Sequence, residues 1–354
     1  MKKLLLSLAL LASVPAFAAD TLHLYNWNNY LSADAAKRFE AQCKCKLVQD
    51  YYGDNEEMLA KMAAGAKGYD IVVPTGYAVQ ALMGQGKAEK LDKSKIANAK
   101  NLNPAYLNAF FDKGNQYSLP YALTTTVLGY NETALKKLGI ADKANSWALI
   151  FDPAVLAKIK GKVIVLDSQR ELVAAALMYL GKPANSTNPA DWKAARDVIL
   201  KAKPYWATFN NQSYIKELTV GNMLVAMGYS NDMVQAREDA KKAKRPFVVS
   251  FGLQKEGNTM SVDNFVVLKD APRKDLAYQF INFMLDGKNG AELTNSMGTG
   301  SPNAASMAFV NKEIAKSTAV FPTKADMPRL QQLQDLNSRQ RRELNRLWAE
   351  IKLK

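Results

Sequence analysis

The 354-residue sequence has few of the side chains on which most hydrolases depend. It holds a single histidine, His23, and it contains no His-Glu-x-x-His zinc helix and no phosphate-binding glycine loop. One histidine on a predicted strand excludes most Ser-His and Cys-His catalytic designs. Chemistry based on paired carboxylates stays open, because their separation depends on the fold. We therefore expect that the protein is not an enzyme and holds no cofactor.

Cysteine is scarce as well, with Cys43 and Cys45 as the only two. One residue separates them, so a bridge between them would close a small, strained ring. We therefore expect free thiols or an intermolecular disulfide. A zinc site is not expected, because Cys-x-Cys is not the usual structural-zinc spacing and His23 is the only histidine.

Long apolar runs are absent apart from the first residues of the chain. Lys2 and Lys3 precede an apolar run over 4–14, and Ala16-Phe17-Ala18 has the small-x-small pattern of a cleavage site. The run is too short to span a membrane. We predict a signal peptide over 1–18 and a secreted protein located in a bacterial periplasm.

Acidic residues are outnumbered, and the formal net charge is +14. A strongly basic protein suggests an anionic partner such as nucleic acid. Here the charge is spread thinly along the chain, and a periplasmic location argues against nucleic acid. A cationic ligand would meet net repulsion, so local carboxylates in a cleft of low dielectric would have to outweigh the overall charge.

What the sequence does have is a series of strands that end in polar and aromatic residues. The first strand, over 22–26, runs into Trp27, Asn28, Asn29 and Tyr30 just before a helix. In open α/β sheets, ligands bind at this end of the strands. Aromatic residues can also simply fill a strand–helix corner, and a helix dipole favours a first-turn carboxylate without any ligand. The same pattern recurs after three later strands, with Thr75, Tyr77, Ser168, Glu171, Tyr229 and Asp232.

The chain length suits two domains, and the alternation of strands and helices predicts an α/β fold with mostly parallel sheets. A long extended segment over 117–131 is typical of a crossover between two lobes, although an ordinary long strand would give the same pattern. The final helix carries an apolar face and a cluster of arginines, Arg339, Arg341, Arg342 and Arg346. Such a cluster is usually a solvated face, with a docking surface as the alternative.

Several motifs resemble those of the periplasmic spermidine/putrescine-binding proteins, the substrate receptors of polyamine ABC importers. They are Tyr25-Asn26-Trp27-x-x-Tyr30, the segment from Pro120 to Asn131, Ser146-Trp147 and Lys255-Glu256-Gly257. The resemblance implies a type II-like two-lobe binding protein with hinge crossovers. Lobe 1 would comprise 19–123 and 259–300, and lobe 2 would comprise 124–258 and 301–354. It also implies a monomer that delivers a polyamine to a membrane permease.

The resemblance also assigns the ligand site. Asp263 matches the family's main ammonium-binding aspartate, and Ser261 and Thr299 stand where relatives carry aromatic residues. Asn29 replaces an acidic residue of some relatives. The expected site residues are Trp27, Asn28, Asn29, Tyr30, Thr75, Tyr77, Ser168, Glu171, Tyr229, Asp232, Ser261, Asp263 and Thr299.

The departures at these positions keep other ligands open. The alternatives are a receptor for another cationic or amine-containing metabolite, a periplasmic hydrolase on a similar scaffold, and a docking protein that uses the arginine-rich helix.

Overall fold

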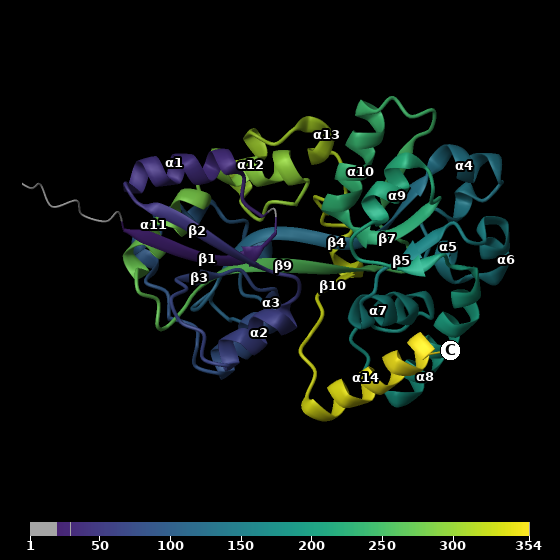
Figure 1. Ribbon diagram of the computed structural model, residues 1–354, viewed down its shortest axis with the longest axis horizontal. Helices are drawn as coiled ribbons and strands as arrows, with labels where there is room; N and C mark the ends of the chain where they lie inside the picture. The colour runs from purple at the N-terminus through teal and green to yellow at the C-terminus, as the bar shows by residue number, and fades with distance from the viewer. Residues whose placement is uncertain (1–19, 29, 354) are drawn as a thin grey trace, which may run out of the picture.

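Two long strands, β4 (Leu119–Asn131) and β9 (Asn258–Val267), cross the centre of the molecule and connect its two halves (Figure 1). The computed structural model describes residues 20–28 and 30–353. The first part of β4 pairs with β9, and its second part pairs with β7 (Val225–Tyr229) and β8 (Val249–Gly252), always antiparallel. Strand β4 therefore belongs to both halves of a sheet ordered β2-β1-β3-β9-β4-β7-β5-β6.

The half that contains the N-terminal strands is built on parallel pairs, since β1 pairs in parallel with both β2 and β3. Its core is rich in aromatic side chains, among them Phe39, Phe265 and Phe280, each at most 1% exposed. Its elements are β1 (Thr21–Trp27), α1 (Ala33–Cys43), β2 (Lys46–Tyr52), α2 (Asn55–Ala63), β3 (Ile71–Val72), α3 (Gly76–Gly84), α11 (Lys274–Met284) and α12 (Gly287–Met297).

The other half repeats the plan, with β5 parallel to both β6 and β7. A large separate core surrounds the fully buried Trp147. Its elements are α4 (Glu132–Lys137), α5 (Ala148–Phe151), α6 (Pro153–Leu156), β5 (Val163–Val165), α7 (Gln169–Tyr179), α8 (Pro189–Ala202), β6 (Thr208–Phe209), α9 (Tyr214–Val220) and α10 (Ser230–Lys242). The chain ends with α13 (Lys312–Ala315), β10 (Leu330–Gln331) and α14 (Ser338–Leu353).

Helices α1 and α2 begin at residues whose side chains cap them. The Ser32 hydroxyl accepts the Ala35 N–H at 3.0 Å. Asp54 accepts the Glu57 N–H at 2.7 Å, and the Glu57 carboxylate in turn accepts the Gly53 N–H at 2.7 Å. These bonds satisfy helix N–H groups that would otherwise lack partners.

Two motifs that are far apart in the sequence bind one another. The Ser146 hydroxyl donates to the Glu256 carboxylate, and the Trp147 indole N–H donates to the Gly257 carbonyl at 2.8 Å. The Ser-Trp and Lys-Glu-Gly motifs are thus the two sides of one contact, which anchors the loop between β8 and β9 to the core.

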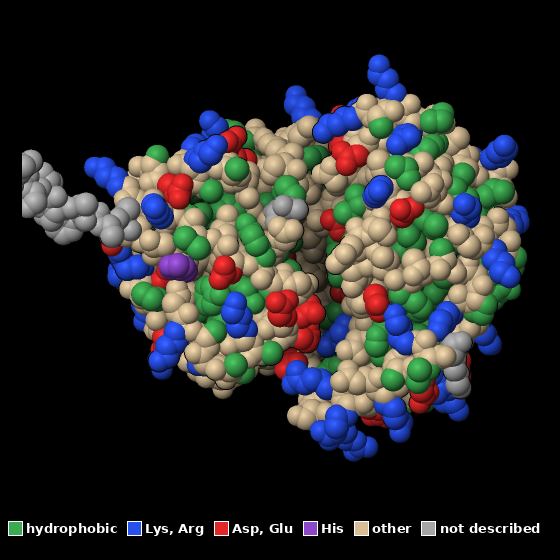
Figure 2. Space-filling view, viewed as in Figure 1, with side chains coloured by type: hydrophobic (Ala, Val, Ile, Leu, Met, Phe, Trp, Pro, Cys, Tyr) green, Lys and Arg blue, Asp and Glu red, His purple; other side chains and the backbone are tan. Residues whose placement is uncertain are grey.

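A groove separates the two halves on the face shown in Figure 2. Lys and Arg side chains are scattered over this face, as the thin distribution of charge along the sequence predicts. Within the part of the chain that the structure describes, no helix is long and apolar enough to cross a membrane. The predicted signal peptide over 1–18 lies outside the described residues.

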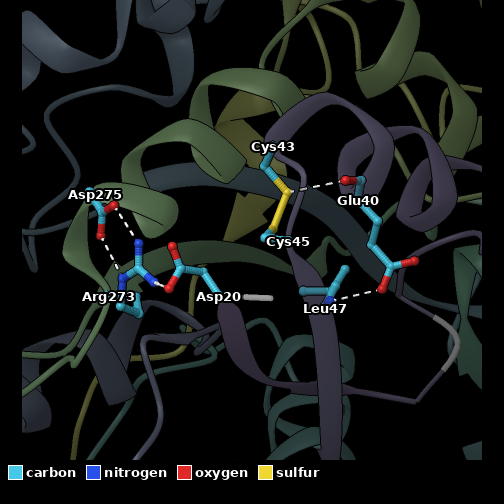
Figure 3. Close-up of a disulfide and its surroundings, with 7 residues drawn as sticks. All are labelled: Asp20, Glu40, Cys43, Cys45, Leu47, Arg273 and Asp275. Carbon is cyan, nitrogen blue, oxygen red and sulfur yellow. Dashed lines mark hydrogen bonds and ion pairs between the residues drawn. A yellow bond between two sulfur atoms is a disulfide. The ribbon is translucent and has the colours of Figure 1, made fainter. Parts of the chain in front are cut away.

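The expectation for the cysteines was wrong, because Cys43 and Cys45 form an intramolecular disulfide (Figure 3). Their Cα atoms are 5.2 Å apart, within the usual range for a bridge. The intervening Lys44 adopts a left-handed conformation (φ 55°) at the end of α1, and this turns the chain enough to bring the two side chains together. The one-residue spacing alone did not reveal this backbone conformation.

Candidate ligand-binding cleft

Asp263 is the most buried carboxylate of the candidate site. It lies on β9 with 3% of its surface exposed, and the Tyr30 hydroxyl donates to its Oδ2 at 2.9 Å. Its Oδ1 has no hydrogen-bond partner among the described residues. Burial raises the pKa of Asp263 to about 7, although the hydrogen bond from Tyr30 acts in the opposite direction. The free oxygen is therefore an acceptor for which the described chain supplies no donor.

An aromatic wall stands beside this carboxylate, at the end of β1. The Trp27 indole N–H and the Tyr52 hydroxyl both donate to the Val73 carbonyl, at 2.7 and 2.6 Å. The Trp27 ring lies 4.5 Å from the Tyr52 ring and 6.4 Å from the Tyr30 ring. The Tyr121 hydroxyl donates to the Tyr30 carbonyl and fixes the backbone there. These contacts hold Trp27 and Tyr30 in place through the side chains of Tyr52 and Tyr121 and the backbone carbonyl of Val73.

The junction after β3 is organised by Asn55, at the start of α2. Its side-chain N–H groups donate to the Thr75 hydroxyl at 2.6 Å and to the Tyr77 hydroxyl at 3.2 Å. Tyr77 then donates to the Glu56 carboxylate at 3.0 Å. Thr75 forms an antiparallel bridge with Asp263, so this junction lies directly beside the buried carboxylate.

Glu171 faces the site from the opposite half. The Thr259 hydroxyl donates to its carboxylate at 2.6 Å. Burial raises the pKa of Glu171, and hydrogen bonds from Thr259 and Thr126 counteract part of this rise. Ser168 caps α7 by accepting the Glu171 N–H at 3.4 Å, so it helps to set the position of Glu171.

Asp232 is the second carboxylate of that half, in the first turn of α10. The Tyr214 hydroxyl donates to its Oδ2, and the Asn231 amide donates to its Oδ1 at 2.9 Å. Burial raises the pKa of Asp232 to about 6, and the bond from Tyr214 limits the rise. Both of its oxygens thus have donors within the chain.

Tyr229, at the end of β7, shows that these groups converge. Its pKa is raised well above the usual value, first by burial and then by the negative charges of Glu171, Asp232 and Asp263. Burial also raises the pKa of Tyr30, and the negative charges of Asp263 and Asp232 add to this rise. Carboxylates from both halves therefore act on the same two tyrosines.

The remaining predicted residues occupy less central positions. Asn28 is exposed in the turn after β1, and Asn29 lies outside the described residues. Ser261 is partly exposed on β9, opposite Thr124. Thr299 is fully buried, and its hydroxyl has no partner within the described chain. None of these residues adds an aromatic ring to the cleft.

Sequence reasoning did not identify the residues that hold the site residues in place. Tyr52, Tyr214 and Thr259 lie on segments whose pattern shows only an ordinary strand or helix. Asn55 follows the capping residue Asp54, but nothing in the sequence indicates its bonds to Thr75 and Tyr77. These partners become visible only once the segments are folded together.

The arrangement combines buried carboxylates with aromatic rings, a set that suits an organic cation. Within residues 20–28 and 30–353, no group of three or more His, Cys, Asp or Glu side chains could hold a metal ion.

Residues 34–323 match the family model described as bacterial extracellular solute-binding protein. The chain belongs to this family. It is 57% identical over 355 residues to the putrescine/cadaverine-binding protein of Pseudomonas aeruginosa, and the match covers all of both chains. It is 36% identical to the putrescine-binding periplasmic protein PotF of Escherichia coli, over 96% of this chain and 94% of that one.

Solved structures agree with these relatives. The TpPotD lipoprotein of Treponema pallidum superposes with a TM-score of 0.82 and 27% identity, over 95% of this chain and all of that one. The family and the two-lobe α/β fold predicted from the sequence are thereby confirmed.

Proposed function

We propose that the protein is a periplasmic receptor that binds a putrescine-like polyamine in the cleft and delivers it to an ABC importer. The names of the relatives at 57% and 36% identity support this ligand class. The protein would act without catalysis, as a monomer, and its partner would be the importer's membrane permease.

The single observation that carries the proposal is the free Oδ1 of Asp263. A buried acceptor without a donor is costly, and an ammonium group would supply both the missing hydrogen bond and the compensating charge. Trp27 and Tyr30 lie beside it and offer ring faces to the methylenes and the ammonium of an alkyl diamine, each worth about 0.5–2 kcal/mol. Glu171 would accept the second ammonium, and the charge of Asp232 would attract it.

Ligand bridging is the proposed trigger for closure. Asp263 would belong to a lobe formed by 19–123 and 259–300, and Glu171 and Asp232 to a lobe formed by 124–258 and 301–354. A diamine held at both ends stabilises the closed arrangement over the open one, and the permease would respond to that closed state.

The test is calorimetric titration of the ligand-stripped protein with putrescine, cadaverine, spermidine and spermine, followed by basic amino acids. We expect saturable one-to-one binding of a diamine at micromolar concentration or tighter. Absence of heat with every polyamine, from a sample shown to be folded, would refute the proposal and direct the search to amine-containing acids.

A further inference from the structure

Arg170 is a cation placed at the cleft between the two halves. It lies in the first turn of α7, immediately before Glu171. Its guanidinium carbon is 5.9 Å from the centre of the Tyr77 ring, which belongs to the opposite half. Tyr77 is one of the predicted ligand-site residues, and its hydroxyl donates to the Glu56 carboxylate. The guanidinium of Arg170 therefore faces a residue of the predicted site.

The guanidinium is held in place but forms no direct ion pair among the described residues. One of its N–H groups donates to the Gln334 carbonyl at 2.7 Å, in the segment before α14. It forms no ion pair within 4 Å among the described residues. Burial lowers the pKa of Arg170, while Tyr77 and the carboxylates of Glu171, Glu56 and Asp335 oppose this effect, which places these groups within electrostatic reach. A half-buried, unpaired positive charge therefore lies at this end of the cleft.

On the basis of the proposed function, we propose that Arg170 is a specificity-determining residue that makes the cleft select diamines over longer, more highly charged polyamines. A diamine can place one ammonium at Asp263 and the other at Glu171, within the attraction of Asp232. A third ammonium that extends past Glu171 meets the Arg170 charge, and Ser168 on the same helix turn supplies no compensating carboxylate. Like charges a few ångströms apart in a half-buried site repel strongly.

The repulsion would act at one end of the groove. Figure 2 shows acidic side chains gathered at its lower rim on the half that carries α2, and Lys and Arg side chains across from them. The acidic first turn of α2 contains Glu56 and Glu57. A cation that leaves this acidic rim would therefore approach positively charged side chains on the other half.

The experiment compares the affinities for spermidine and putrescine in wild type, Arg170→Gln and Arg170→Lys by calorimetry. Glutamine keeps an N–H donor for the Gln334 carbonyl and removes the charge. Arg346→Gln is the matched control, because it removes an exposed positive charge from α14. We expect Arg170→Gln to raise the spermidine-to-putrescine affinity ratio about tenfold or more. Arg170→Lys and Arg346→Gln should leave the ratio within about twofold.

Each other result has a distinct meaning. An unchanged ratio in Arg170→Gln, with putrescine still bound, would overturn the inference and leave the proposed function intact. An equal loss for both amines would show that Arg170 only supports the fold. Binding of an amine-containing acid that is lost in Arg170→Gln would identify an anion-binding role instead. Failure of the wild type to bind any polyamine would refute the proposed function itself.

Discussion

Asp263 and Asp232 approach the cleft from its two halves, and their surroundings differ in one decisive respect. Asp263 is 3% exposed on a strand, has one donor and keeps Oδ1 without a partner among the described residues. Asp232 is half-buried in the first turn of α10, where the helix dipole favours an anion, and donors reach both of its oxygens. The first carboxylate keeps an acceptor without a partner among the described residues, and the second has donors on both oxygens. The two should therefore differ in their importance for binding.

The largest effect should come from removing the first carboxylate. We expect Asp263→Asn to weaken putrescine binding by about 1.5–3 kcal/mol, the usual value of a hydrogen bond to a charged group. Calorimetric titration at pH 8 measures the loss. Asp270→Asn, in an exposed turn after β9, is the matched control and should bind as wild type does. Unchanged affinity in Asp263→Asn would remove this residue from the site.

The same substitution should stabilise the ligand-free protein. Because the pKa of Asp263 is raised from 3.8 to about 7, the folded state loses stability as pH rises through this interval, and the loss is complete above it. The full interval corresponds to at most about 4 kcal/mol. Asp263→Asn should therefore unfold at a higher temperature than wild type at pH 8, with the difference vanishing near pH 4.

A smaller effect should follow from pH alone. Below pH 7 the ligand-free protein holds a proton on Asp263, and an ammonium must displace it. We expect putrescine affinity to fall about tenfold between pH 8 and pH 6, as the ionised fraction of the group declines. Titrations in buffers of different ionisation enthalpy should detect proton release on binding near pH 6.5. In Asp263→Asn the putrescine affinity should hardly change with pH above pH 6.5. An affinity that falls as steeply as in wild type would mean that another group causes the pH dependence.

The comparison also shows which features a sequence can reveal. The caps Ser32 and Asp54 are recognisable from the sequence because a cap depends on residues a few positions away, and both accept the expected helix N–H groups. The bond between Tyr30 and Asp263 joins residues 233 positions apart, so no local pattern could predict it. It arises because β9 returns to pair with β3 and β4, which brings Asp263 beside the end of β1.

The disulfide was missed for a related reason. Residue spacing alone suggested strain, but Lys44 adopts a left-handed conformation where the chain passes from α1 into β2, and this brings the two cysteines within bridging distance. Likewise, Asp232 was predicted as a site residue, but its hydrogen bond with Tyr214 was not, because that contact joins the starts of two helices. The sequence shows which residue types stand at the strand ends, but it does not show which hydrogen-bond donors contact them and shift their pKa.

The smallest effect should come from the satisfied carboxylate. In Asp232→Asn the side chain can still accept the hydrogen bond from Tyr214, so the local packing should persist. The substitution removes the negative charge, and thus a longer-range attraction, but it removes no acceptor oxygen that was free before binding. We therefore expect the binding free energy to weaken by about 0.5–1 kcal/mol in calorimetric titration. A loss as large as that of Asp263→Asn would mean that the ligand displaces Tyr214 or Asn231 and bonds to Asp232 directly. Tyr214→Phe separates these cases, because it frees Oδ2 in advance and should then strengthen binding only if the ligand reaches that oxygen.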